Sequence, residues 1–130
     1  MAEAKFSAFK VLIVDDELAI RNMIDFVLKD MGFKYTFLEV NGAAAMESLN
    51  LAIEPFDLII CDWMMPEMNG LEFLKKARAM GCEASFVMLM AKNTEDAAAA
   101  AKDEGVDAYI AKPFTPHQLQ IKIQSLFREE

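Results

Sequence analysis

Three aspartates and one lysine mark the ends of apolar runs in this sequence. Asp15 and Asp16 close the first run, and Asp62 closes another. Lys112 directly follows a further apolar run, residues 107–111. If these runs are parallel strands, their carboxyl ends meet at the edge of the sheet where ligands of such sheets bind. An Asp-Asp pair alone would predict an exposed loop, with Asp16 capping a helix, but that interpretation leaves Asp62 unexplained.

Carboxylates crowded in this way favour a hard cation. They repel one another and raise one another's pKa. A pocket that is rich in oxygen and free of sulfur suits Mg²⁺, which keeps several waters and binds through one or two carboxylates. With the cation in place, one carboxylate can attack a phosphoryl group and form an acyl phosphate. Lys112 would supply positive charge for the transferred oxygens.

Five apolar runs predict the strands that carry these residues. The first, third and fourth runs are nearly continuous rather than alternating, which is typical of parallel strands covered on both faces. Helical patterns fall between them. Right-handed strand–helix units then predict an α/β fold, an open parallel sheet with helices on both faces. The predicted strands cover residues 10–15, 35–39, 57–62, 85–90 and 107–111.

The predicted helices begin and end at recognisable residues. The first has an apolar face that includes Ile24 and Val27, and Gly32 should close it. The second covers about residues 43–50. The remaining three helices have N-terminal capping signals, which are Asn69, Thr94, and a capping box of Thr115 and Gln118 with Pro116 at the first helical position.

The composition limits the classes of partner. With 130 residues, the chain is expected to form one domain, residues 1–8 being an N-terminal extension. The net charge of -8 argues against nucleic acid and anionic membranes as partners. No signal peptide is seen, and no apolar run approaches the ~20 residues of a membrane span. Cys61 and Cys82 lack zinc-site spacing and are expected to be reduced thiols in a cytoplasmic protein.

Three segments, in this order, resemble the receiver domains of two-component systems. They are VLIVDDE (residues 11–17), IICDWMMPEMNGLEF (59–73) and AYIAKPFT (108–115), and the resemblance covers nearly the whole chain. The stretch Asp62-Trp63-x-Met65-Pro66-x-Met68 is most similar to the single-domain chemotaxis (CheY-like) group.

The resemblance implies a fold and a site. The fold is a flavodoxin-like (βα)5 three-layer sandwich with strand order 2-1-3-4-5. Asp62 is the phosphoacceptor. Asp16 and Asp62 ligate Mg²⁺ directly, Asp15 acts partly through water, and the backbone carbonyl of Met64 completes the protein ligands. Lys112 contacts the phosphoryl group, and its bond to Pro113 is cis.

The resemblance also implies how such a chain works. It is no enzyme beyond its own magnesium-dependent phosphorylation and dephosphorylation. A sensor histidine kinase of the chemotaxis type would be the phosphodonor. Tyr109 matches the aromatic switch residue. The face made by the fourth helix, fifth strand and fifth helix would bind a downstream protein such as a flagellar motor switch component. The chain is expected to be a monomer.

One position departs from the family pattern. The family has Ser or Thr at the end of the fourth strand, and this chain has Met90 there. A lost hydrogen bond to a charged acceptor is worth about 1.5–3 kcal/mol. Three interpretations stay open: a receiver that signals weakly or acts as a phosphate sink, a ground state altered by Met90 in the space used by Tyr109, or a laboratory substitution or harmless variant. Altered switching, with Tyr109 turned toward solvent, is the prediction.

Two other functions fit a sheet of this kind. A magnesium-dependent phosphatase with an aspartate nucleophile would need a second Asp two residues later, where this chain has Met64. A flavin-binding electron carrier would need a phosphate loop after the first strand. The acidic residues Asp15 and Asp16 would repel that phosphate.

Overall fold

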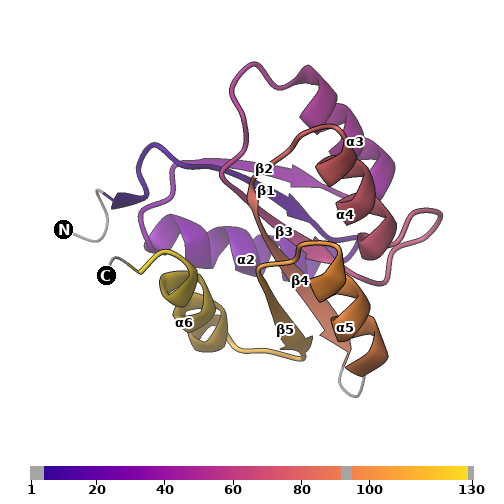
Figure 1. The fold of residues 1–130 in the computed structure, drawn as a ribbon. Helices are drawn as coiled ribbons and strands as arrows, with labels where there is room; N and C mark the ends of the chain where they lie inside the picture. Colours follow the sequence, from indigo (N-terminus) through magenta and orange to yellow (C-terminus); the bar gives the residue numbers. More distant parts are fainter. Residues whose placement is uncertain (1–4, 92–94, 129–130) are drawn as a thin grey trace.

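The computed structural model describes residues 5–91 and 95–128 and, of residues 95–98, the backbone alone. Strands and helices alternate along the chain (Figure 1). The strands are β1 (Lys10–Val14), β2 (Tyr35–Glu39), β3 (Leu58–Asp62), β4 (Ser85–Ala91) and β5 (Ala108–Lys112). The helices are α2 (Leu18–Asp30), α3 (Gly42–Leu51), α4 (Gly70–Ala79), α5 (Glu95–Asp103) and α6 (Pro116–Leu126).

The five strands form one parallel sheet in the order β2-β1-β3-β4-β5. Figure 1 shows α2 and α6 on one side of this sheet and α3, α4 and α5 on the other. This three-layer arrangement confirms the predicted α/β fold and strand order. The strand ends differ from the prediction by at most one residue. Strand β1 stops at Val14, so Asp15 begins the following loop, and β5 extends to Lys112.

Each face of the sheet has its own apolar core. Side chains of a strand alternate between the two faces. Val11, Ile13, Leu58 and Ile60 lie in the core under α2 and α6. Leu12, Val14, Ile59 and Cys61 lie in the core under α3, α4 and α5. Both cores are needed because the central strands are buried on both sides, which explains their nearly continuous apolar sequences.

The helix ends follow the predicted capping residues. The side chain of Asn69 accepts from the backbone of Glu72 at the start of α4, and Thr115 and Gln118 form the capping box of α6. Gly32 follows α2 with φ 105°, a left-handed conformation that only glycine adopts at little cost. The predicted cap Thr94 lies outside the described residues.

The segment before β1 packs on the domain. Phe6 is buried and stacks on Phe33 with ring centroids 4.3 Å apart. Phe9 and Phe127 complete an aromatic cluster, with centroids 5.1 Å apart. We name Phe6, Phe9, Phe33 and Phe127 the aromatic clasp, because they join the first and last described segments at the amino end of the sheet.

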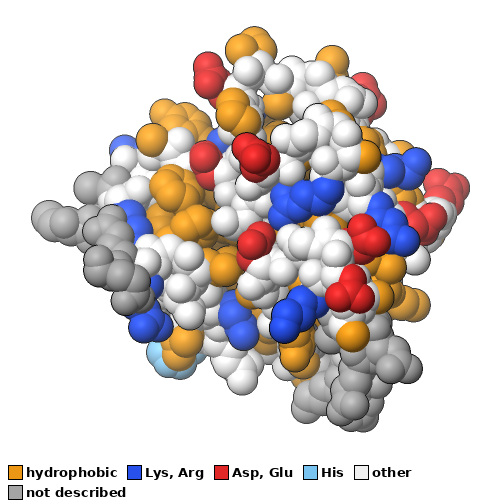
Figure 2. All heavy atoms as spheres, in the orientation of Figure 1, with side chains coloured by type: hydrophobic (Ala, Val, Ile, Leu, Met, Phe, Trp, Pro, Cys, Tyr) orange, Lys and Arg blue, Asp and Glu red, His pale blue; other side chains and the backbone are white. Residues whose placement is uncertain are grey.

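The described surface carries charges of both signs. Figure 2 shows Lys and Arg side chains interspersed with Asp and Glu side chains on the viewed face, among hydrophobic ones. That face therefore presents no broad basic surface among the residues that the structure describes. Within residues 5–91 and 95–128, no helix has the length and apolar character required to cross a bilayer.

Candidate functional site

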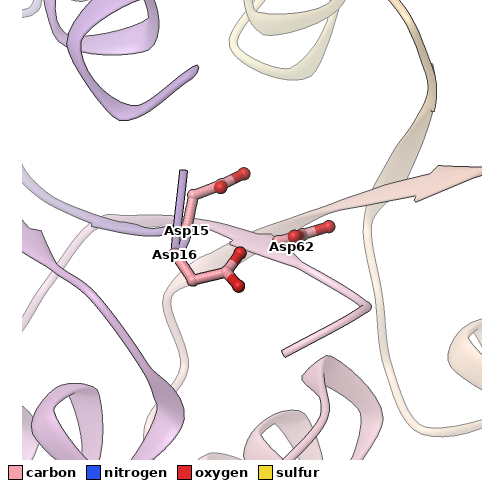
Figure 3. Close-up of side chains that lie close together, drawn as sticks. All are labelled: Asp15, Asp16 and Asp62. Atoms are coloured by element: carbon pink, nitrogen blue, oxygen red, sulfur yellow. The ribbon is translucent and has the colours of Figure 1, made fainter. Parts of the chain in front are cut away.

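The three predicted aspartates converge at the carboxyl edge of the sheet. Figure 3 shows Asp15 and Asp16 at the end of β1 and Asp62 at the neighbouring strand end. One carboxylate oxygen from each lies within 4.8 Å of the other two. Strands β1 and β3 are adjacent, and the pairing of Val14 with Cys61 brings the next residues, Asp15 and Asp62, side by side. Asp15 and Asp62 are buried, whereas Asp16 is exposed.

Lys112 reaches the same edge from β5. Its Nζ lies 3.1 Å from Asp62 Oδ1 and 3.2 Å from Asp15 Oδ2. Strand β4 separates β5 from β3, so the long side chain of Lys112 extends across the end of β4. The peptide bond between Lys112 and Pro113 is cis, as the resemblance implied. The sheet therefore brings an ammonium group into contact with both buried carboxylates.

Hydrogen bonds from neighbouring segments hold Asp15 in place. Its Oδ1 accepts a 2.8 Å hydrogen bond from the backbone N–H of Glu17, and its carbonyl oxygen accepts one from Arg21 Nη1. The backbone N–H of Asp15 donates to the carbonyl of Glu39 on β2. The backbone of Asp15 is therefore held from β2 and α2, and its carboxylate is oriented by the backbone N–H of Glu17.

Burial opposes the charges on both carboxylates. Burial raises the pKa of Asp15, and hydrogen bonding from Glu17 and the charge of Lys112 offset part of that rise. Burial and repulsion from Asp15 raise the pKa of Asp62. For Lys112, burial alone would lower the pKa, but Asp62 and Asp15 together raise it above its ordinary value. One ammonium group therefore does not fully compensate the two buried carboxylates, Asp15 and Asp62.

This donor set fits a magnesium ion. The cluster holds three carboxylates, and Lys112 contacts two of them, Asp15 and Asp62, so a divalent cation would balance the remaining negative charge. Among the described residues of the cluster, the groups able to bind a metal are carboxylates, because the Cys61 thiol is fully buried and its pKa is raised well above its usual value. Hard cations of this size prefer oxygen ligands. Asp15, Asp16 and Asp62 are therefore the described residues that could hold Mg²⁺.

The remaining predicted site residues flank this cluster. Met64 is 70% exposed, and its backbone hydrogen bond to the Asp62 carboxylate holds the Asp62 pKa down in part. Met90 is 2% exposed and packs in the core under α3, α4 and α5. Tyr109 is 52% exposed. It pairs with Met88, two residues before Met90. The ring of Tyr109 thus lies partly in solvent, on the strand next to Met90, and its role as a switch stays a prediction.

Sequence reasoning missed two neighbours of the cluster. Glu17 lies 3.7 Å from Lys112, and Arg21 binds the carbonyl of Asp15. Their closeness to the acidic pair in the sequence could have indicated them, because Glu17 directly follows Asp16 and Arg21 lies one helical turn further. Neither contact follows from residue type, because both depend on how the loop after β1 turns into α2.

Comparison with known proteins agrees with this geometry. The phosphate regulon transcriptional regulatory protein PhoB of Klebsiella pneumoniae is 40% identical over 124 residues, 93% of this chain and 52% of that relative. The chain thus spans about half the length of the PhoB relatives it matches. The chemotaxis protein CheY of Pseudomonas aeruginosa is 36% identical over 120 residues, 91% of this chain and 95% of the relative.

The fold and the family comparison point the same way. The structure of Vibrio cholerae chemotaxis protein CheY4 has a TM-score of 0.84 and 31% identity to this chain, covering 93% of this chain and 100% of that one. Residues 11–124 match the response regulator receiver domain, a span that includes both the acidic cluster and Lys112. The chain therefore belongs to the response regulator receiver family of two-component signalling.

Proposed function

We propose that this chain accepts a phosphoryl group on Asp62 in a magnesium-dependent reaction and signals by docking to a partner protein. The observation that carries the proposal is the contact of Lys112 with Asp62 at 3.1 Å, beside the Asp15–Asp16 pair. An ammonium at that distance from the nucleophile can bind the oxygens of an arriving phosphoryl group. The proposal covers all of residues 1–130 as one receiver domain.

The residues divide the work of phosphoryl transfer. A carboxylate oxygen of Asp62 attacks phosphorus, the bond from phosphorus to the donor breaks, and the donor leaves with the bonding electrons. Lys112 exchanges its carboxylate contacts for contacts with the transferred oxygens. When bound, Mg²⁺ supplies positive charge for the phosphoryl oxygens. Asp16, Asp62, the carbonyl of Met64 and, through water, Asp15 are the ligands we propose for it.

A mass measurement tests this function. The protein is incubated with Mg²⁺ and phosphoramidate, and its intact mass is recorded over time. One labile phosphoryl adduct is expected in the wild type, and none in Asp62→Asn or with a chelator. Repeated turnover of an added phosphomonoester would instead favour the phosphatase. An adduct that persists in Asp62→Asn would overturn the assignment of the phosphoacceptor.

The face formed by α5, β5 and α6 supports docking. Tyr109 on β5 and Ile121 on α6 are 52% and 50% exposed. A hollow of about 470 Å³ beside Tyr109 is bordered by Lys102, Lys122 and Asp107, and Asp107 is already paired with Arg78. Exposed apolar groups with basic neighbours fit a partner segment that is apolar and acidic. This face corresponds to the helix four–strand five–helix five face of the sequence prediction.

We further propose that the kinase and the downstream partner are of the chemotaxis type. A chemotaxis-type histidine kinase would donate the phosphoryl group, and a flagellar motor switch component would bind the α5–β5–α6 face. Similarity to both CheY and PhoB relatives makes a direct comparison useful. Binding of a motor switch peptide should tighten when beryllofluoride occupies Asp62. If affinity is unchanged while beryllofluoride is bound, either this output is wrong or Met90 has uncoupled it.

A further inference from the structure

Lys112 has a third carboxylate neighbour outside the acidic cluster. Its Nζ lies 3.7 Å from Glu17 Oε1, in addition to its contacts with Asp15 and Asp62. The Lys112 side chain is 21% exposed and that of Glu17 is 64% exposed. One ammonium is therefore shared by two buried site carboxylates and one carboxylate at the surface.

The fold uses the backbone of Glu17 but not its carboxylate. Glu17 is the N-cap residue of α2, yet its side chain makes no capping hydrogen bond. Its backbone N–H donates to Asp15 Oδ1, and its carbonyl accepts from the backbone of Arg21. The carboxylate is left to contact Lys112, so its removal should spare both the helix start and the orientation of Asp15.

We propose that the Glu17 carboxylate competes with the incoming phosphoryl group for Lys112 and so slows phosphorylation of Asp62. This inference rests on the proposed function. To bind the transferred oxygens, Lys112 must leave its carboxylate partners. A cation held by Asp15, Asp16 and Asp62 compensates those carboxylates directly. Glu17 lies outside that cluster, so its attraction for Lys112 persists after the cation binds.

The size of the effect follows from exposure. An ion pair with one well-exposed partner is weakened by solvent and salt. Its loss should therefore raise the rate of phosphorylation only modestly, by roughly two- to fivefold. The gain should shrink at high ionic strength. A purely structural role for Glu17 would give no such salt dependence.

The test compares Glu17→Gln with wild type at saturating Mg²⁺. The rate of adduct formation is measured by intact mass with two donors, phosphoramidate and the more highly charged acetyl phosphate. Competition for Lys112 predicts a similar gain with both donors. General charge repulsion predicts a clearly larger gain with acetyl phosphate, and that result would overturn the competition mechanism.

Asp30→Asn is the matched control, because it removes one negative charge from the opposite end of α2. Its rate should equal that of wild type. Melting temperatures of all three proteins establish that each is folded. If wild type forms no adduct on Asp62, the proposed function fails. If wild type is labelled and Glu17→Gln is no faster at low salt, the function stands and the role of Glu17 is refuted.

Discussion

The α-carbon of Gly70 lies so close to the end of β3 that an added Cβ would be 2.6 Å from the carbonyl oxygen of Asp62. The same Cβ would be 2.7 Å from Met88 Sδ. The backbone N–H of Gly70 also donates to the carbonyl of Trp63. The first residue of α4 therefore restricts the position of the backbone that carries Asp62, the proposed phosphoacceptor.

Gly70→Ala should displace Asp62 and slow its phosphorylation. A methyl group against backbone atoms cannot be accommodated by a rotamer change, so we expect a loss of about 1–3 kcal/mol in the free energy of unfolding. Urea unfolding and the rate of adduct formation measure the two effects. Gly81→Ala is the control, because Gly81 has φ +90° but open space around its Cβ position. It should lose stability through backbone strain and keep the wild-type rate.

Removing the Asp62 carboxylate should stabilise the metal-free protein. Asp62→Asn relieves the repulsion between two buried carboxylates and leaves Lys112 paired with Asp15. We expect a gain on the order of 1 kcal/mol, seen as a few degrees in melting temperature. Mg²⁺ should raise the melting temperature of wild type more than that of the variant. Asp16→Asn, which removes an exposed carboxylate, should give a smaller gain. A lower melting temperature for metal-free Asp62→Asn would contradict the crowding of buried charges.

The stability of the metal-free protein should depend on the protonation of Asp15 and Asp62. Both pKa values are raised above 3.8 in the folded state, so the folded protein keeps these protons to higher pH than the unfolded chain. The stabilisation that comes from binding these protons more tightly in the folded state is fully present below the unfolded pKa. It is lost as pH rises through the folded pKa. The stability advantage of Asp62→Asn over wild type should therefore be larger near pH 7.5 than near pH 4.5. Thermal melts of both proteins at several pH values measure this difference in stability. A difference that grows as pH falls would contradict the raised pKa of Asp62.

Introducing a hydroxyl at position 90 should strengthen the response of Tyr109. By the resemblance to the family, Met90→Thr would supply a hydrogen-bond donor to a phosphoryl group on Asp62, worth about 1.5–3 kcal/mol, or a factor of ten or more in a two-state equilibrium. The lost packing of a buried Met should cost about 1–3 kcal/mol of stability. Fluorine NMR of fluorotyrosine-labelled protein follows the Tyr109 ring with and without beryllofluoride.

Met88→Thr controls for the packing loss. Met88 is a buried methionine on the same strand and the same side of the sheet as Met90, and it pairs directly with Tyr109. It should lose stability without a larger beryllofluoride response. An unchanged Tyr109 signal in Met90→Thr, with beryllofluoride bound, would show that Met90 is not what limits switching.

The segment before β1 should be part of the folded unit. Phe6 is 4% exposed and stacks on Phe33, so Phe6→Ala should cost about 3 kcal/mol. Chemical denaturation measures the loss. Phe26→Ala, at a position that is 72% exposed on α2, should change stability by less than about 0.5 kcal/mol. If the two variants are equally stable, residues 5–8 behave as the extension that the sequence predicted.

The sequence predicted the sheet because its strands carry an unambiguous signal. Ile59 and Ile60 sit in a run that is apolar on both faces, and few structures other than a buried parallel strand need that. The acidic site followed from strand topology, since Asp15 and Asp62 end adjacent strands. What the sequence could not give was burial. The residue pattern did not show which carboxylates are buried: Asp15 and Asp62 are buried, so the unfavourable burial of charge concerns these two, whereas Asp16 is exposed.

The other features that the sequence did not predict are contacts between side chains far apart in the chain. The aromatic clasp depends on Phe6 meeting Phe127, a contact between residues at opposite ends of the chain, which no local pattern records. The contact of Glu17 with Lys112 is of the same kind. Long-range pairs of this type depend on where loops direct side chains, and loop geometry is only weakly encoded in residue type.

The aromatic clasp has a practical consequence for attaching this protein to surfaces, tags or other domains. It gathers the first and last described segments at the amino rim of the sheet, while Asp62 lies at the carboxyl rim. A linker joined at residue 5 or residue 128 would start at the rim opposite Asp62, so immobilisation through it should leave the proposed phosphorylation site open to donors in solution.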